Sequence, residues 1–168
     1  MANHKERGTF NVSEETYVQK ITPFLWFDGK AEEAMRFYVS VFKNSQVLSV
    51  TKGPNGSAMS VAFQLEGQNF LGLNGGPQFT FSPAISLFVN CETQQEVDEL
   101  WEKLSEGGEK SRCGWLKDQF GLSWQIIPSI LGKLLQDKDS EKARRVMQAM
   151  LQMDRIDING LQQAYDQR

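Results

Sequence analysis

The chain has 168 residues, of which 40% are hydrophobic and 23% charged, a composition typical of a folded globular protein and not of a disordered one. Its formal net charge of −3 offers no basic surface to nucleic acid or to an anionic membrane. No apolar run approaches the roughly 20 residues of a membrane-spanning helix, and the polar start shows no signal-peptide core, so we expect a disordered leader over 1–19 and a cytoplasmic protein.

The composition also limits the chemistry. The single histidine, His4, lies in the leader, so a folded region without imidazole cannot use a histidine base or bind a metal through histidine. Cys91 and Cys113 form no CxxC pair and are expected to be small core residues, although the sequence does not decide whether they ever pair with each other.

The first half of the chain predicts a β-α-β-β-β unit. In order, its elements are a strand over 20–27, a helix over 31–42, and strands over 45–52, 58–65 and 68–74. The helix is indicated by Ala31, Met35 and Tyr38, which recur at helical spacing. Asn55-Gly56 between two β-type runs is typical of a hairpin turn. This unit is expected to span 20–77.

The second half repeats this order. Its predicted elements are a strand over 83–89, a helix from the Thr93–Glu96 capping box to Gly107-Gly108, a weak strand near 109–111, and strands over 113–117 and 122–127. Pro23 and Pro83 occupy comparable positions before the two helices, which indicates a tandem repeat. We therefore predict an α+β fold of two βαβββ modules, the second over 83–128.

A helical extension is expected over 129–168. Asp139 or Ser140 can cap one helix, and Asp157 can cap another. The methionines of this region recur at helical spacing, which favours a core-facing stripe over a soft ligand surface.

Three segments carry a resemblance to a known family: Ile21-Thr22-Pro23-Phe24-Leu25-Trp26-Phe27-Asp28-Gly29 with the helix that follows, 118–126, and 146–150 with 156–158. In this order they resemble PhnB-like proteins of the glyoxalase/bleomycin-resistance/dihydroxybiphenyl-dioxygenase (vicinal oxygen chelate) superfamily. This branch often carries the label 3-demethylubiquinone-9 3-methyltransferase. The resemblance implies two βαβββ modules whose curved sheets form a cup for a small ligand, in a homodimer.

Metal-dependent relatives place His, Glu or Gln at four points on the strands that face the cup. Carried over by the resemblance, these points fall on Pro23, on Gly72 or Asn74, on Ala84 and on Gln125. Two amides and two apolar residues supply no charge to offset the dehydration of a divalent ion. We therefore expect no metal and no cofactor.

Strand alternation then predicts which residues line the cup. If Pro23 faces inward, so do Leu25 and Phe27, while Phe24 and Trp26 pack under the first helix. The predicted ligand-binding residues are Pro23, Leu25, Phe27, Asn74, Ser86, Phe88, Ser123 and Gln125, with Ala84 and Ile127 on the same side. Such apolar walls with a few neutral polar groups suit a mostly apolar small molecule.

Three functions stay open at this point. The chain binds a small molecule without a metal, or it is an enzyme, either the methyltransferase of the family label or a glyoxalase- or dioxygenase-type metalloenzyme. The sequence has no glycine-rich turn between a strand and a helix of the kind that binds S-adenosylmethionine in the common class of methyltransferases. The inward residues could also only fill the interior.

Overall fold

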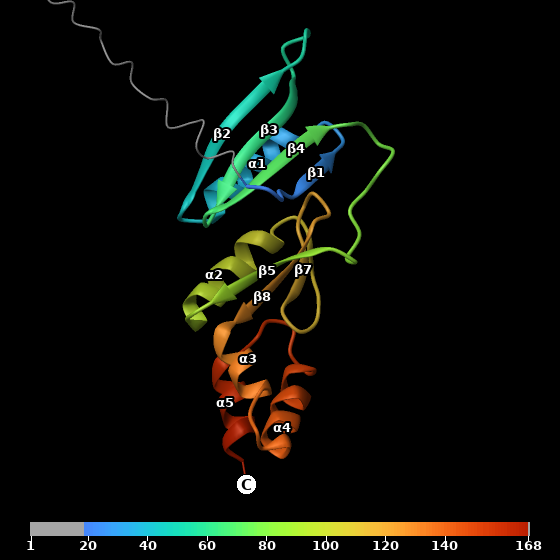
Figure 1. The fold of residues 1–168 in the computed structure, drawn as a ribbon. Coiled ribbons are helices and arrows are strands. Elements are labelled where there is room, and N and C mark those ends of the chain that lie inside the picture. Colours follow the sequence, from blue (N-terminus) through green and yellow to red (C-terminus); the bar gives the residue numbers. More distant parts are fainter. Residues whose placement is uncertain (1–18, 168) are drawn as a thin grey trace, which may run out of the picture. The chain divides into compact units, whose positions relative to one another are not determined.

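The computed structural model describes residues 19–167, and the predicted leader, with His4, lies outside the described residues. The described chain divides into two compact units at Gly76–Pro77 (Figure 1). Residues 19–76 form unit 1, and residues 77–167 form unit 2.

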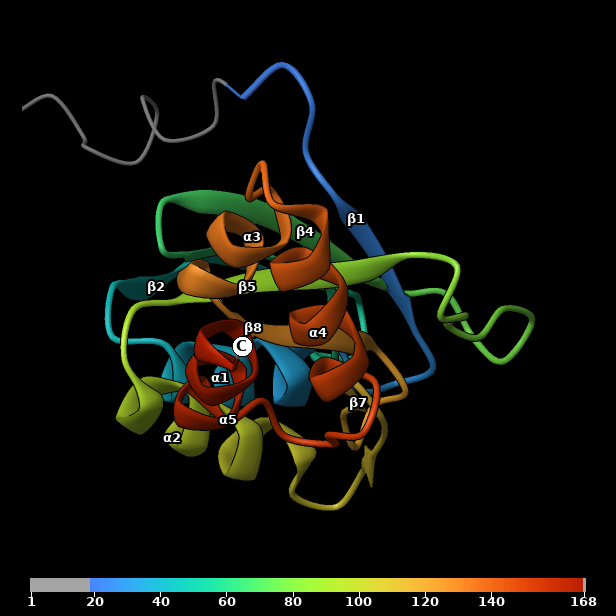
Figure 2. The same cartoon turned by 90° about the horizontal axis from the view of Figure 1, so that it is seen from below.

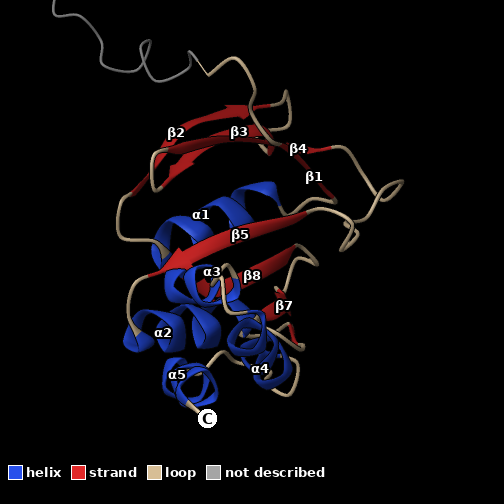
Figure 3. Ribbon diagram, turned by 60° about the horizontal axis from the view of Figure 1, so that its bottom comes forward, coloured by secondary structure: helices blue, strands red, loops and turns tan. Residues whose placement is uncertain are grey.

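Unit 1 is a four-stranded sheet with one helix on one of its faces (Figure 3). Its elements are β1 (Phe24–Phe27), α1 (Ala31–Val41), β2 (Ser45–Lys52), β3 (Ala58–Leu65) and β4 (Gln68–Asn74). The strand order is β1-β4-β3-β2, in which β1 runs parallel to β4 and the other pairs are antiparallel. The predicted Asn55-Gly56 hairpin joins β2 to β3, and the Asn55 side chain accepts a hydrogen bond from the Ser57 backbone N–H.

An aromatic core fills the space between α1 and this sheet. Tyr38 of α1 is fully buried, and its ring centroid lies 6.0 Å from that of Phe63 on β3. Phe63 in turn stacks on Phe70 of β4 at 5.3 Å. Because aromatic pairs add stabilisation beyond the area they bury, this trio fixes which face of the sheet the helix covers.

Unit 2 repeats the arrangement. Its elements are β5 (Ser86–Cys91), α2 (Gln94–Ser105), β6 (Glu109–Lys110), β7 (Trp115–Lys117) and β8 (Ser123–Pro128), with the strand order β5-β8-β7-β6. The Thr93 hydroxyl accepts a hydrogen bond from the Glu96 backbone N–H, so the predicted N-cap of α2 is confirmed. Trp101 and Leu104 of α2 are buried with Trp124 and Ile126 of β8.

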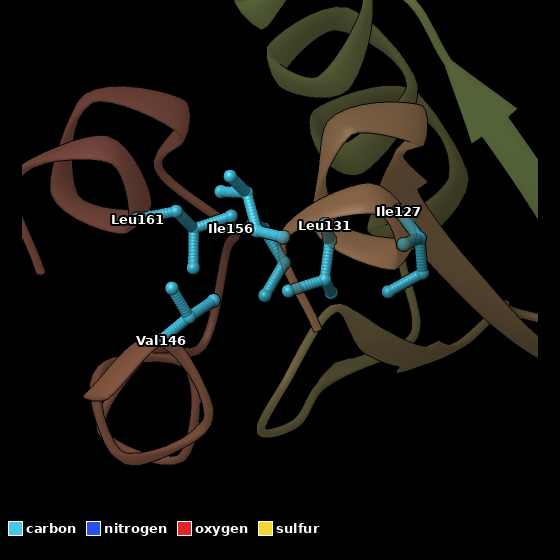
Figure 4. Packing of buried hydrophobic residues seen from close by; sticks show 6 residues of the cluster. Ile127, Leu131, Val146, Ile156 and Leu161 are labelled. Atoms are coloured by element: carbon cyan, nitrogen blue, oxygen red, sulfur yellow. The ribbon is translucent and has the colours of Figure 1, made fainter. Parts of the chain in front are cut away.

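Three further helices follow β8: α3 (Ser129–Leu135), α4 (Ser140–Met150) and α5 (Ile158–Asp166) (Figure 2). We call residues 129–167 the C-terminal extension. Asp139 and Asp157 cap α4 and α5, as predicted. A separate apolar cluster holds the extension together, and Ile127 at the end of β8 joins it (Figure 4). Its buried members are Ile127, Leu131, Leu134, Val146, Ile156 and Leu161.

The predicted α+β fold of two βαβββ modules with a helical extension is therefore confirmed. Three strands start later than predicted: β1 begins at Phe24 and not at residue 20, β5 at Ser86 and not at residue 83, and β7 at Trp115 and not at residue 113. The start of β5 bears on the predicted site. The Ser82 hydroxyl accepts a hydrogen bond from the Ala84 N–H, and the Ser82 carbonyl accepts one from Ile85. These bonds hold residues 82–85 in a turn, so Ala84 lies before the strand.

Candidate ligand-binding faces

In each sheet, one face is covered by α1 or α2, and we call the opposite face the open face. Residues that pair across strands point to the same side, so the register of each sheet assigns its residues to a face. In unit 2, α2 covers the side of Leu116, Trp124 and Ile126, all of which are buried. The open face is therefore that of the alternating residues, which include Gln125.

The open face of unit 2 carries the residues predicted for the second module. Ser86 pairs with Ser123, and Phe88 pairs with Gln125, so all four side chains lie on this side. The Gln125 side-chain N–H donates a hydrogen bond to the Ser86 hydroxyl at 2.9 Å. Phe88 is 54% exposed, whereas Ser123 is buried. The structure thus brings these four residues together, and their binding of a ligand stays a prediction.

The predicted orientation of the first module is wrong. Leu25 and Phe27 are buried on the side of α1, since Leu25 pairs with Gly72 and a side chain at Gly72 would meet Phe27 and Val61 in the core. Phe24, predicted to lie under α1, is 57% exposed. The reason is that residues 23–27 are all apolar, so alternation alone cannot tell the two faces apart.

Pro23 and Asn74 also have structural roles in unit 1. The Pro23 carbonyl accepts a hydrogen bond from the Leu71 N–H, which extends the β1–β4 ladder by one residue. The Asn74 side-chain oxygen accepts the Ala31 N–H at 2.8 Å, and its amide donates to the Ala58 carbonyl at 2.9 Å. Because both halves of the amide are engaged, Asn74 caps α1 and ties it to β3.

The residues that sequence reasoning missed form the open face of unit 1. Its members on β1, β3 and β4 include Phe24, Trp26, Ser60, Ala62, Gln64, Asn69, Leu71 and Leu73. At one end, the Gln64 amide donates to the Asn69 side-chain oxygen at 2.8 Å. The alternation of Ser60, Ala62 and Gln64 with larger apolar residues on β3 was a signal that could have identified this side.

At the other end of this face, the Trp26 side chain is held by one hydrogen bond and by packing against a glycine. Its indole N–H donates to the Gly76 carbonyl at 2.9 Å. A Cβ at Gly75 would lie 2.3 Å from the Trp26 ring, so the ring packs directly over a position where only glycine fits. The Gly75-Gly76 pair therefore serves this aromatic contact at the boundary between the units.

A separate pocket of about 520 Å³ opens at the start of α1, next to Asn74. Two of its polar side chains have partners within unit 1: Glu32 pairs with Arg36 at 2.7 Å, and the Asn55 side chain bonds to Ser57. None of the described residues that line this pocket is aromatic, whereas the open face of unit 2 carries Phe88.

Neither open face fits a divalent metal ion. No group of three or more His, Cys, Asp or Glu residues lies together within residues 19–167. The charged pair Lys117–Glu109, at 3.7 Å, is at the β6–β7 edge of unit 2 and supplies a single carboxylate. Pro23 and Ala84 supply no side-chain oxygen or nitrogen, the Asn74 oxygen already accepts the Ala31 N–H, and Gln125 offers only a neutral amide, so the four points carried over from the metal-dependent relatives do not form a site.

The two cysteines are free thiols. Burial is the main cause that raises the pKa of the Cys91 thiol to about 12, and the nearby carboxylates Glu96 and Glu92 contribute to the same rise. A thiol that stays protonated at neutral pH is a poor nucleophile. Cys91 is a buried core residue, as predicted, whereas Cys113 is only partly buried and lies before β7, so the prediction is wrong for Cys113.

The chain matches the model of the 3-demethylubiquinone-9 3-methyltransferase family over residues 19–127. It belongs to this family. The resemblance to PhnB-like proteins of the glyoxalase/bleomycin-resistance superfamily is thereby confirmed. A similar solved structure is the putative 3-demethylubiquinone-9 3-methyltransferase, PhnB protein, from Bacillus cereus, which is 39% identical. That alignment covers 66% of this chain and 100% of the Bacillus protein, with a TM-score of 0.63.

Two more distant structures share the fold alone. Protein PA1353 from Pseudomonas aeruginosa is 18% identical over 66% of this chain and 97% of its own, with a TM-score of 0.54. The fosfomycin resistance protein FosX from Listeria monocytogenes is 15% identical over 72% of this chain and 99% of its own, also with a TM-score of 0.54. No curated protein matches the chain. Within the described region, no helix is both long and apolar enough to cross a membrane.

Proposed function

We propose that the protein binds a small, mostly apolar molecule on the open face of unit 2, without a metal ion. The observation that carries this proposal is the Gln125–Ser86 hydrogen bond beside the exposed ring of Phe88. An amide and a hydroxyl can orient a ligand, while an aromatic ring supplies the apolar contact area. Binding would also cover an aromatic side chain that is now largely exposed to water.

Neutral polar groups favour an uncharged ligand. Gln125 retains one side-chain N–H and its carbonyl oxygen for a partner, so it can both donate and accept. A carbonyl-bearing ring such as a quinone meets these requirements, because it presents a flat apolar face and two acceptor oxygens. The name of the family, which refers to a ubiquinone derivative, supports the same class of molecule.

Titration with coenzyme Q0, a water-soluble ubiquinone analogue without the isoprenoid tail, tests the proposal. Backbone amide NMR of the labelled protein should show saturable shifts clustered on β5, β7 and β8. Gln125→Ala and Phe88→Ala should each weaken binding by about tenfold, since each removes a main contact. Matched controls are Gln95→Ala, on the surface of α2, and Phe79→Ala, an exposed aromatic outside the sheets.

Equal binding by Gln125→Ala, Phe88→Ala and the parent protein would contradict the location of the site. Calorimetric titration with Ni²⁺, Zn²⁺ and Mn²⁺ tests its metal independence. Micromolar binding of one ion at a defined stoichiometry would overturn it.

Methyl transfer is the second candidate, and the family name favours it. It requires S-adenosylmethionine, so saturable binding of this cofactor at micromolar concentration would support methyl transfer against simple ligand binding. No glycine-rich strand–helix turn is available for the cofactor in the sequence, which is why we place this function second.

A further inference from the structure

The C-terminal extension lies beyond the region matched by the family model, which ends at residue 127. It is nonetheless packed into unit 2 and not attached as a separate tail. Ile127, which shares the open side of β8 with Gln125, is only 7% exposed because it joins the core of the extension (Figure 4). The extension therefore borders one end of the open face.

The extension is also bonded to the turn that leads into β7. The Cys113 and Gly114 N–H groups donate to the carbonyls of Met153 and Asp154 at 2.8 and 2.7 Å. From the other side, the Gln94 side chain of α2 donates to the Ile156 carbonyl at 3.0 Å and accepts the Ile158 N–H at 2.8 Å. Residues 153–158 are thus held between this turn and α2.

The turn itself has little freedom. Cys113 has a φ of 58°, and Gly114 a φ of 80°. A Cβ at Gly114 would lie 2.7 Å from the Ile126 carbonyl oxygen and 3.2 Å from the Ile156 side chain. The turn therefore lies between β8 on one side and the extension on the other. Both neighbours determine where β7 begins.

Trp115 is the first residue of β7 and follows this turn directly. It pairs with Gln125 across the β7–β8 ladder, so their side chains lie next to each other on the open face. We propose that the extension is a positioning element of the ligand site: by holding residues 113–114, it fixes the Trp115 ring beside Gln125. This inference rests on the proposed function for its effect on binding, but the position of Trp115 can be measured without a ligand.

The test uses the full-length protein labelled with 5-fluorotryptophan. Four tryptophans give four ¹⁹F resonances, and Trp115→Phe identifies that of Trp115. Gln94→Ala and Ile156→Ala should each shift or broaden the Trp115 resonance and weaken coenzyme Q0 binding by about tenfold. Gln95→Ala, one position along α2, and Ile156→Val, which keeps most of the buried side chain, should leave both readouts close to those of the parent protein.

The outcomes separate the two proposals. If the parent protein binds coenzyme Q0 and Gln94→Ala changes neither the Trp115 resonance nor the affinity, the positioning role is wrong. If the parent protein does not bind, the proposed function fails for quinones, and the Trp115 resonance in the variants still decides whether the extension fixes the ring. Should Ile156→Ala fail to fold, Gln94→Ala carries the test, since it removes only hydrogen bonds from a partly exposed side chain.

Discussion

Among single residues, a side chain that the sequence predicts to bind a ligand can instead hold elements of the fold together. Asn74 is the clearest example, because the family resemblance predicted it to be a ligand-binding residue. Instead its oxygen caps α1 and its nitrogen reaches β3, so one side chain links three elements. Gln125 is different, because its one intramolecular partner leaves further hydrogen-bonding capacity.

Asn74→Ala should therefore reduce stability. The change removes the cap of α1 and the bond to the Ala58 carbonyl, and we expect a loss of about 2 kcal/mol in the free energy of unfolding. Urea denaturation measures this value. Asn159→Ala, on the exposed surface of α5, is the matched control and should change it by less than about 0.5 kcal/mol. An unchanged unfolding midpoint for Asn74→Ala would show that the cap is dispensable.

Cys91 should be inert in the folded protein. With the pKa of its thiol raised by burial to about 12, it should not react with a disulfide reagent at pH 8 until the chain unfolds. The folded pKa lies above the usual value of 9.0, so the associated stability is present below pH 9 and is lost as the pH rises toward 12. Thiol titration of Cys113→Ser with and without denaturant isolates Cys91, and rapid labelling of the native variant would contradict its burial.

At the scale of elements, tight turns set where the strands of unit 2 lie. The buried carboxylate of Asp118 accepts the N–H groups of Phe120 and Leu122 and the indole N–H of Trp124, at 2.8–3.0 Å. It thus closes the β7–β8 connection and anchors the largest core residue of the sheet at the same time.

Asp118→Ala should lower the free energy of unfolding by about 3 kcal/mol or more, because it leaves three donors without their acceptor. Asp118→Asn keeps one oxygen and should lose less, whereas Gln119→Ala, at the exposed neighbouring position, should be nearly neutral. Equilibrium denaturation followed by Trp fluorescence gives all three values. Equal stability of the alanine variant and the parent protein would rule out this role of Asp118.

The elements differ in how well the sequence predicts them. The order of the elements could be predicted from helix caps and turn glycines, which are local signals, and from the repeat. The face of β8 could also be predicted, since Ser123 and Gln125 alternate with large apolar residues. In β1 every residue is apolar, as is Pro23 before it, and only the packing of Tyr38 and Phe63 decides the face. Turn 113–114 depends on contacts with residues 153–156, distant in the chain, and no local pattern predicts it.

At the scale of the whole molecule, we predict a homodimer, as the resemblance implies. β2 and β5 are edge strands of their sheets, and an exposed edge is a site at which another chain can pair. Light scattering coupled to size-exclusion chromatography should give twice the chain mass of 19.1 kDa. A monomeric mass at high protein concentration would contradict the prediction. The cytoplasmic location expected from the sequence likewise stays a prediction.

The link made by Asn74 has a consequence for chemical ageing. Asparagine followed by glycine is the dipeptide most prone to deamidation, and Asn74 precedes Gly75. The product, a carboxylate, could still receive the Ala31 N–H but could no longer donate to the Ala58 carbonyl. The attack requires the Gly75 backbone nitrogen, whose N–H donates to the Phe27 carbonyl at 3.0 Å, and a side chain free to rotate, whereas two hydrogen bonds restrain the Asn74 amide. The bonds that secure the helix therefore also protect the residue from spontaneous damage.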